Sequence, residues 1–199
     1  VLVSGSNDDP VTVGVIANQS GNDSSSVNLD VSSFFTDPDT TDPLTFSAGT
    51  TLPPGLSINP TTGVISGTLD SSASVGGPYT VVITATDPQG ATVTQTFVWT
   101  VTNPIPVAQD DNFTVNENGT ISGNVFANNG NGVDNDPDGD SFSVTAVAGG
   151  AGNVGNATAG SNGGLFTINS NGTLAFDPNG QFDYLALGES ATTTTTYTI

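Results

Sequence analysis

The sequence predicts an all-β chain folded as two tandem β-sandwiches, and three features support this fold class. Apolar β-branched and aromatic residues alternate with polar ones in segments such as 79–86 (YTVVITAT) and 92–102 (TVTQTFVWTVT). The chain also contains 25 glycines and 12 prolines, which separate these segments and oppose helices. Finally, several motifs recur about one sandwich length apart. Short strands with frequent turn signals are typical of sandwiches.

The repeats define the spacing of the two sandwiches. The motif N-x-x-P-V at 7–11 recurs at 103–107, which is 96 residues later and matches the size of one seven-strand sandwich. The segment DPDTTDPLTF at 37–46 is echoed by DPDGDSFSV at 136–144. Because the offset then grows along the chain, we expect the second copy to carry an insertion in the glycine- and asparagine-rich stretch 148–164.

The repeated motifs also indicate that the given sequence does not begin and end at the boundaries of a sandwich. Residues 1–7 (VLVSGSN) match 97–103 (FVWTVTN), the last strand of the first copy. We therefore expect 1–9 to be the last strand and linker of a preceding module, 10–103 to form one sandwich, and 104–199 to form another. The second copy lacks a counterpart of its last strand or strands, which would expose a sheet edge. Either the continuing chain or a strand from another copy would fill that gap.

Composition excludes several classes of function. The formal net charge is −19, with no lysine, arginine, histidine or cysteine. Contacts to nucleic acid phosphates require basic residues, as does binding to an anionic membrane, and disulfides or thiolate zinc sites require cysteine. A chain without histidine, cysteine or lysine lacks the usual catalytic bases and nucleophiles. A pair of carboxylates could hydrolyse glycosides, but the acids here cluster in turn loops, so we expect no enzyme.

Four segments resemble a known group of extracellular repeats. Residues 62–90 (TGVISGTLDSSASVGGPYTVVITATDPQG) resemble the cadherin pattern, and 52–68 (LPPGLSINPTTGVISGT) resemble its bacterial putative-Ig, dystroglycan-like branch. Residues 106–144 are similar to cadherin-like and VCBS-type repeats of large bacterial surface adhesins, and 171–199 resemble the second half of a VCBS repeat. The resemblance implies Ig-like or cadherin-like Greek-key sandwiches at the bacterial cell surface, with Ca²⁺ bound where consecutive modules meet.

The resemblance also implies a set of calcium ligands. Calcium takes six to eight oxygen ligands from carboxylates, amides and backbone carbonyls, and D-x-D on a loop turns two carboxylates toward one point. At the first junction the implied ligands are Asn7, Asp9 or its neighbour Asp8, Asp37, Asp39 and Asp87. At the second they are Asp70, Asn103, Asp110, Asp111, Asp134, Asp136, Asp138 and Asp140. Glu117 matches the family's basal glutamate and would serve a further junction.

Two other interpretations compete for the aspartates of 134–140. An EF-hand requires a glutamate six places after the glycine, where Thr145 stands, and flanking helices, so we reject it. Alternatively, Asp-Pro-Asp-Gly runs are favourable turn sequences whose charges are simply solvated. The acids Asp177, Asp183 and Glu189 are expected to be surface or turn residues.

Two functions remain open at this point. One is a structural spacer in a calcium-stiffened extracellular adhesin or filament, in contact with neighbouring repeats of the same chain or with identical subunits head to tail. The other is a carbohydrate-binding module, which would require an exposed aromatic platform or a calcium with an open coordination position. The single Trp99 lies mid-strand, so we expect it to be buried. Few aromatic residues are left for a platform, and this favours the spacer.

Overall fold

The computed structural model describes residues 1–2 and 4–199, which form two compact units, Val1–Pro104 and Ile105–Ile199. The strands of the first unit are β1 (Val11–Thr12), β2 (Gln19–Asn22), β3 (Ser26–Asp30), β4 (Phe35–Thr36), β5 (Thr45–Ser47), β6 (Leu56–Ile58), β7 (Val64–Thr68), β8 (Tyr79–Thr86) and β9 (Thr92–Thr102). Those of the second are β10 (Ile121–Asn124), β11 (Ala146–Val147), β12 (Thr158–Ala159), β13 (Leu165–Ile168), β14 (Thr173–Asp177) and β15 (Tyr197–Thr198). The described helical elements are the short α1 (Ala73–Gly76) and two 3-10 turns, Ser32–Phe34 and Ala151–Asn153.

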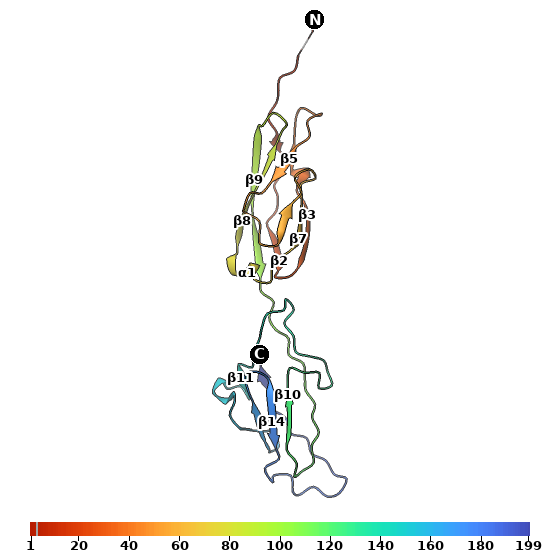
Figure 1. Cartoon of the computed structure of the whole chain (residues 1–199), viewed down its shortest axis with the longest axis vertical. Helices are drawn as coiled ribbons and strands as arrows, with labels where there is room; N and C mark the ends of the chain where they lie inside the picture. The colour runs from red at the N-terminus through yellow and green to blue at the C-terminus, as the bar shows by residue number, and fades with distance from the viewer. Residues whose placement is uncertain (3) are drawn as a thin grey trace. The chain divides into compact units, whose positions relative to one another are not determined.

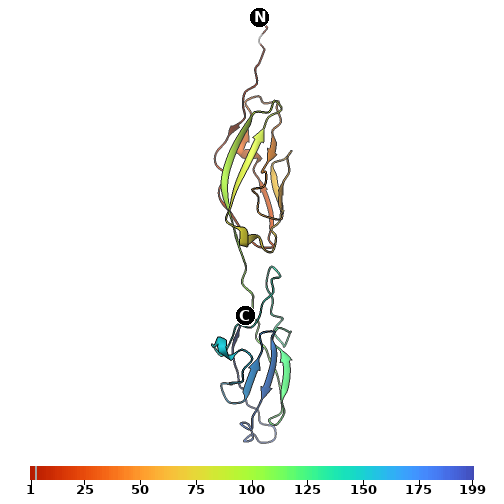
Figure 2. The ribbon, with the colours of Figure 1, turned by 60° about the vertical axis from the view of Figure 1, so that its left-hand side comes forward.

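The first unit is a sandwich of two main sheets, with strand orders β2-β9-β8-β5 and β3-β7-β6. Figure 2 shows these sheets face to face, with β8 and β9 in yellow and green on one side. Strand β9 is central in its sheet, because it pairs parallel with β2 and antiparallel with β8. In addition, β1 and β4 form a separate, short antiparallel pair. This arrangement, repeated in part by the second unit, confirms the predicted all-β fold class of tandem sandwiches.

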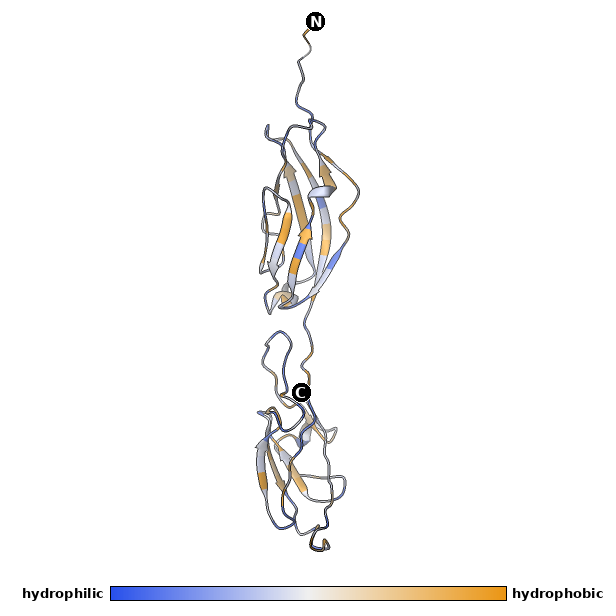
Figure 3. Cartoon of the chain, turned by 90° about the vertical axis from the view of Figure 1, so that its right-hand side faces the viewer, coloured by the Kyte–Doolittle hydropathy of each residue, from blue (hydrophilic) through white to orange (hydrophobic). Residues whose placement is uncertain are grey.

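Period-two alternation explains why β8 and β9 form and which face they bury. In β8 the side chains of Val81, Ile83 and Ala85 are buried, while the residues between them are more exposed. In β9, Phe97 and Trp99 enter the same core, with ring centroids 6.1 Å apart. The prediction that Trp99 is buried is therefore confirmed, with 2% of its surface exposed. Figure 3 shows hydrophobic residues on the strands and mainly hydrophilic loops.

The second unit has a four-stranded sheet, β10-β14-β13-β12, and a separate pair, β11-β15. Its core is smaller and consists of Val125, Val144, Val147, Ile168 and Leu174. The order β10-β14-β13 repeats β3-β7-β6 of the first unit, and the antiparallel pair β11-β15 repeats β5-β8. The stretch 148–164, expected as an insertion, contains a 3-10 turn and β12, the fourth strand of the large sheet.

The N-terminal segment of the first unit precedes its first strand, β1. Residues 1–2 and 4–9 are exposed and lie outside any strand, and Figure 1 shows the chain leading away from the sandwich there, in red. Val3, part of the strand predicted at 1–7, lies outside the described residues. No described helix is long or apolar enough to cross a membrane.

Candidate metal centres

Acidic loops gather at the end of the first unit where β4 and β8 finish. Asp37 directly follows β4, and Asp87 directly follows β8. The side chain of Asn7 donates from Nδ2 to Asp87 Oδ2 at 2.9 Å, and the backbone N–H of Asp8 donates to Asp39 Oδ2 at 2.8 Å. The N-terminal segment thus joins the two loops, and four of the ligands implied for the first junction lie at one end of the sandwich.

The two buried carboxylates of this group differ in how their oxygens are satisfied. Asp87 Oδ1 accepts backbone N–H groups of Gln89 at 3.0 Å and Ala91 at 2.7 Å. The hydrogen bond from Asn7, followed by these backbone donors, holds the pKa of Asp87 below its usual value. Asp37 Oδ1 accepts the N–H of Asp39 at 2.8 Å, but its Oδ2 is buried with no hydrogen-bond partner among the described residues.

The loop that contains Asp37 also borders an open cavity. The cavity has a volume of about 430 Å³, and its lining includes Asp37, Asp39, Asp42, Leu44 and Phe46. A buried charged oxygen without a partner is costly, because its hydration is lost and nothing replaces it. The chain has no basic side chain to neutralise it. A cation in this cavity would provide the missing counter-charge.

A second group forms in the second unit around the hydroxyl of Tyr197. This hydroxyl lies 3.0 Å from Asp111 Oδ2, 2.9 Å from Asp134 Oδ2 and 3.0 Å from the carbonyl oxygen of Gln109. A hydroxyl has one proton, so it can donate to only one of these three oxygens at a time. The group therefore contains more acceptor oxygens than donor protons.

Further donors fix the two carboxylates in place. The backbone N–H of Gln109 donates to Asp134 Oδ1 at 2.7 Å, and Asn129 Nδ2 donates to Asp111 Oδ1 at 2.8 Å. Burial is the largest cause that raises the pKa of Asp111, and burial followed by the two carboxylates raises the pKa of Tyr197 strongly. Asp111 and Asp134 were among the implied ligands, whereas Tyr197, Asn129 and Gln109 were not expected.

The loop 136–140 combines a tight turn with a close pair of carboxylates. The N–H of Asp138 donates to Asp136 Oδ1 at 3.1 Å, and Gly139, with φ of 87°, donates to the carbonyl of Asp136 at 3.2 Å. These bonds fit the turn interpretation. In addition, a hydrogen bond between the two side chains lowers the pKa of Asp136 and raises that of Asp138.

The remaining implied ligands are dispersed. Asp9, Asn103, Asp110 and Asp140 are exposed. Glu117 accepts a 3.3 Å hydrogen bond from the side chain of its neighbour Asn118. In the part of the chain that the structure describes, no three acidic side chains converge closely enough to hold a metal by themselves. Any cation would therefore need amide, backbone or water oxygens in addition.

Near Asp70, an implied ligand, the structure has a buried acid that the sequence analysis did not single out, Asp23. Asp70 is exposed and lies in the short segment between β7 and α1. Asp23 is 3% exposed, and its Oδ1 accepts the N–H of Ser74 at 2.8 Å. Its Oδ2 is buried without a partner among the described residues. Both Asp23 and Asp70 raise the pKa of Tyr79, after the larger effect of burial, so the three groups are close.

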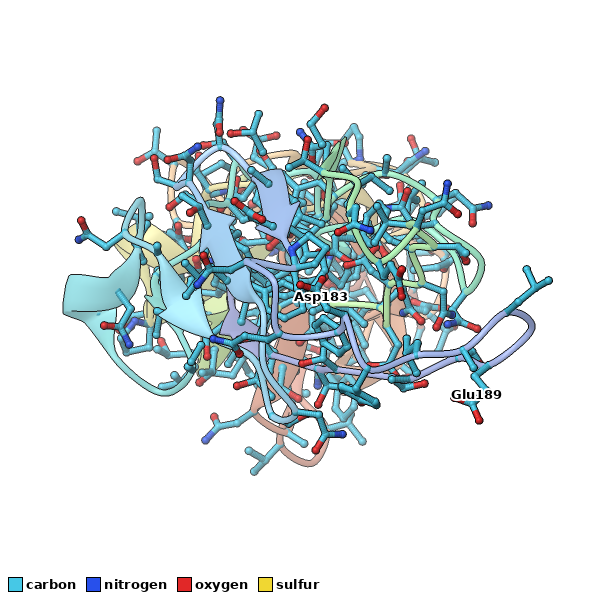
Figure 4. The ribbon with its side chains drawn as sticks, turned by 90° about the horizontal axis from the view of Figure 1, so that it is seen from below. Asp183 and Glu189 are labelled. Carbon is cyan, nitrogen blue, oxygen red and sulfur yellow. The ribbon has the colours of Figure 1, made fainter. Side chains whose placement is uncertain are left out.

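Three acids were expected to be surface or turn residues, and the structure places them on exposed loops or at a turn. Asp177 Oδ1 accepts the N–H of Asn179 at 2.8 Å within a turn. Asp183 and Glu189 are exposed, and Figure 4 shows Glu189 on a loop that projects from the body of the second unit. Its Oε2 accepts the N–H of Ala186 at 3.0 Å, three residues earlier in the same loop.

Solved structures similar to this chain come from several kinds of protein. Human protocadherin-24 EC1-2 is 17% identical and has a TM-score of 0.40, over 98% of this chain and 94% of that one. The protocadherin GammaB4 extracellular domain is 19% identical with a TM-score of 0.42, over 88% and 27%. A nucleoside hydrolase-related hypothetical protein from Saccharophagus degradans is 22% identical with a TM-score of 0.37, over 48% and 26%. The chain thus spans 26–38% of the length of the first three structures that it matches.

Family models account for nearly the whole chain. No curated protein matches the sequence. The model described as Putative Ig domain matches residues 9–102, and the model described as Bacterial cadherin-like domain matches residues 103–199. The first unit is therefore similar to Putative Ig domains and the second to bacterial cadherin-like domains.

Proposed function

We propose that this chain is a structural spacer of an extracellular bacterial adhesin, and that Ca²⁺ bound at the acidic ends of its sandwiches stiffens and stabilises it. The observation that carries the proposal is the buried Oδ2 of Asp37, which has no hydrogen-bond partner among the described residues and belongs to an acidic loop that borders a cavity. It belongs to a chain with 19 acidic residues and no basic one. Such a net charge disfavours the compact state through self-repulsion, and bound cations relieve that repulsion.

The chemistry of the donor set favours calcium over other metals. Every candidate ligand is a carboxylate, amide or backbone oxygen, and calcium prefers such oxygens. The chain has no thiolate or imidazole, the ligands that transition metals favour. Asp37 and Asp39, with additional amide, backbone or water oxygens, would hold one ion at the end of the first unit. Asp111 and Asp134 would hold another in the second unit, where oxygens exceed protons.

The carbohydrate-binding alternative lacks a built platform among the described residues. Trp99 is buried in the first core. Tyr79 and Tyr197 use their hydroxyls in hydrogen bonds to Ala73 and to the Asp111 group. Tyr184 is 69% exposed and its ring is 6.5 Å from that of Phe182, but Phe182 is itself buried. One exposed ring does not make a stacking surface, so the spacer is favoured.

Thermal unfolding with and without calcium tests the proposal. Ligands that bind only the native state stabilise it by RT ln(1 + [L]/Kd). With a Kd of about 10⁻⁴–10⁻³ M, typical of extracellular modules, 10 mM calcium would add about 1.4–2.7 kcal/mol per site. Each kcal/mol raises the Tm of a domain of this size by about 4–8 °C. We expect the midpoint in 10 mM calcium to exceed that in EDTA by several degrees, and equal midpoints would contradict the proposal.

The variant Asp37→Asn sharpens the test, with Asp183→Asn as a control that removes the same charge from an exposed position. In EDTA, Asp37→Asn should be as stable as wild type or more so, because a buried unpaired charge is gone. In calcium it should lose most of the stabilisation of the first unit. Asp183→Asn should respond to calcium as wild type does. If both variants respond equally, Asp37 is not a ligand.

A further inference from the structure

A tight turn follows β14 in the second unit (Figure 1). The N–H of Gln181 donates to the carbonyl of Pro178 at 3.1 Å and closes the turn around Asn179 and Gly180. These two central residues have positive φ angles of 53° and 64°, as in a type I′ turn, which asparagine and glycine tolerate. Both residues are exposed. The turn therefore presents an Asn-Gly pair to the solvent.

An asparagine followed by a glycine can lose ammonia without an enzyme. The backbone nitrogen of the glycine gives its proton to water or hydroxide and attacks Cγ of the asparagine side chain. The N–Cγ bond forms, the Cγ–Nδ2 bond breaks, and the leaving nitrogen takes a proton from water and departs as ammonia. The succinimide ring that remains adds water at one of its two carbonyl carbons and opens to aspartate or isoaspartate. Glycine favours ring closure because it has no Cβ to obstruct the attack.

The second unit contains six Asn-Gly pairs, and in five of them the N–H of the glycine is already hydrogen-bonded. The five bonds are Gly119 to the carbonyl of Asn116 at 2.9 Å, Gly163 to that of Gly160 at 3.2 Å, Gly172 to that of Asn169 at 2.9 Å, and Gly130 and Gly132 to Asn128 Oδ1 at 3.1 and 3.2 Å. Such a bond must break before the nitrogen can lose its proton and turn toward the side chain. These five bonds therefore slow ring closure.

The sixth pair, Asn179 and Gly180, lacks this protection. Among the described residues, neither the N–H of Gly180 nor the side-chain amide of Asn179 has a hydrogen-bond partner. In contrast, Asn129 donates from Nδ2 to Asp111 Oδ1 at 2.8 Å, so its side chain is fixed as well as the N–H that follows it. Both groups that react in the Asn179 pair are therefore available.

We propose that Asn179 is a site of self-modification, where the folded chain converts asparagine to aspartate and isoaspartate faster than at its other Asn-Gly pairs. Ring closure requires the turn to open. Two bonds in the described turn oppose the opening, that of Gln181 to Pro178 and that of the Asn179 N–H to Asp177 Oδ1 at 2.8 Å. The inference uses no metal ligand, so it stands or falls independently of the proposed function.

The aspartate product fits the same turn. Residues 177–180 read Asp-Pro-Asn-Gly and would become Asp-Pro-Asp-Gly, the sequence of 136–139. In both loops, the N–H two residues after the first aspartate donates to Oδ1 of that aspartate, at 2.8 Å for 177–179 and 3.1 Å for 136–138. Aspartate also tolerates a positive φ. Conversion to aspartate would therefore keep the turn and add one carboxylate to it.

The isoaspartate product would disturb the turn, because it adds a methylene group to the backbone. The added length would displace the N–H of Gln181 from the carbonyl of Pro178. It would also strain the 3.0 Å bond that Gln181 Oε1 accepts from the N–H of Gly164, which ties the turn to the start of β13. Either product adds a negative charge to a chain that has a net charge of −19, which disfavours the compact state.

Peptide mapping of the full chain after incubation in mildly alkaline buffer tests the proposal. Chymotrypsin cleaves after aromatic residues, and cleavage after Phe176 and Phe182 releases 177–182, a peptide whose only asparagine is Asn179. Mass spectrometry with chromatography separates the aspartate and isoaspartate forms. In the folded chain, we expect Asn179 to react at least fivefold faster than each of the other five Asn-Gly asparagines.

The same incubation in urea separates the effect of structure from that of sequence. Because glycine follows each of the six asparagines, their rates in the unfolded chain should lie within about threefold of one another. Another Asn-Gly pair that reacts as fast as Asn179 in the folded chain would overturn the proposal. A preference for Asn179 that remains unchanged in urea would overturn it too, since it would come from the local sequence and not from the turn.

A matched pair of variants checks the assignment in the intact chain by anion-exchange chromatography, which resolves the added charge. Asn179→Gln keeps a side-chain amide but requires a larger ring, so the earliest acidic species should be lost. Asn118→Gln changes an exposed asparagine whose following glycine has its N–H bonded, and it should age as wild type does. Acidic species that appear as fast in Asn179→Gln as in wild type would contradict the assignment.

Discussion

The side-chain amide of Asn7 lies 2.9 Å from the carboxylate of Asp87, although 80 residues separate them in the sequence. This bond fastens the segment before β1 to the loop after β8. It also explains the lowered pKa of Asp87, because an amide donor stabilises the ionised carboxylate. The carboxylate of Asp87 therefore orders this loop through its hydrogen bonds, and the effect of substitutions there on stability can be predicted.

Replacement of Asp87 by alanine should destabilise the first unit more than replacement by asparagine. Alanine leaves the part-buried hydrogen bonds from the N–H groups of Gln89 and Ala91 without an acceptor, at about 1–3 kcal/mol. Asparagine keeps an acceptor oxygen at that place and should lose less. Denaturant unfolding in EDTA measures both variants, with Asp183→Ala as an exposed control. Equal losses for Asp87→Ala and Asp87→Asn would contradict the role of these hydrogen bonds.

Removal of the hydroxyl in Tyr197→Phe should destabilise the second unit in the absence of calcium. The hydroxyl is a donor to the oxygens of Asp111 and Asp134, and without it two like charges face each other with fewer donors. We expect a loss of about 1.5–3 kcal/mol for a hydrogen bond to a charged group. Tyr184→Phe, at an exposed tyrosine, is the matched control. If calcium binds here, it should restore most of the stability lost in Tyr197→Phe. A loss that calcium does not restore would argue against a site.

Acid should weaken the first unit partly through Asp30, which is not among the candidate metal ligands. Both the N–H and the hydroxyl of Ser32 donate to Asp30 Oδ1, at 2.9 and 2.7 Å, and these bonds lower the pKa of Asp30. A lowered pKa adds stability above the unfolded value, about 3.9 for aspartate, and this stability is lost as pH falls through the folded value. Asp30→Asn should therefore flatten the acid limb of stability against pH, and Asp183→Asn should not. Identical profiles for Asp30→Asn and wild type would contradict this assignment.

The core of the first unit should be sensitive to truncation at Ile83. This residue is fully buried in β8 between the two sheets. Isoleucine to alanine at such a site costs about 2–5 kcal/mol through lost burial and the cavity that remains. Val75→Ala, at an exposed valine of α1, should change stability by less than about 0.5 kcal/mol. Guanidinium unfolding followed by Trp99 fluorescence reports on this unit, and a small loss for Ile83→Ala would mean that its core is loosely packed.

Much of the fold follows from local pattern, and the limits of that pattern are clear in particular strands. The alternation in β8 and β9 predicts both strands and the burial of Trp99, because one face of each must be apolar. The pairs β1–β4 and β11–β15 are only two residues long on each side, too short for periodicity to mark them. Likewise, β12 forms within the glycine- and asparagine-rich stretch, where tertiary pairing with β13 decides the conformation.

The candidate sites show the same division. The family resemblance implies Asp37, Asp39 and Asp87, which lie in loops at one end of the sandwich. It does not lead to Asp23, whose burial depends on packing beside α1. Nor does it lead to Tyr197, whose hydroxyl meets Asp111 and Asp134 only because β15 pairs with β11 across 50 residues of chain. Contacts between distant segments depend on the completed fold, and no local pattern encodes them.

A crystal structure determined in 10 mM calcium, with anomalous scattering to locate the ions, tests the central claim most directly. The account predicts an anomalous peak about 2.3–2.6 Å from Asp37 Oδ2, the calcium–oxygen distance. An oxygen of Asp39 should complete the site together with amide, backbone or water oxygens. The side chain of Asn7 would then turn its oxygen toward the ion in place of its present contact with Asp87. Clear density for these side chains with no ion beside Asp37 would contradict the account.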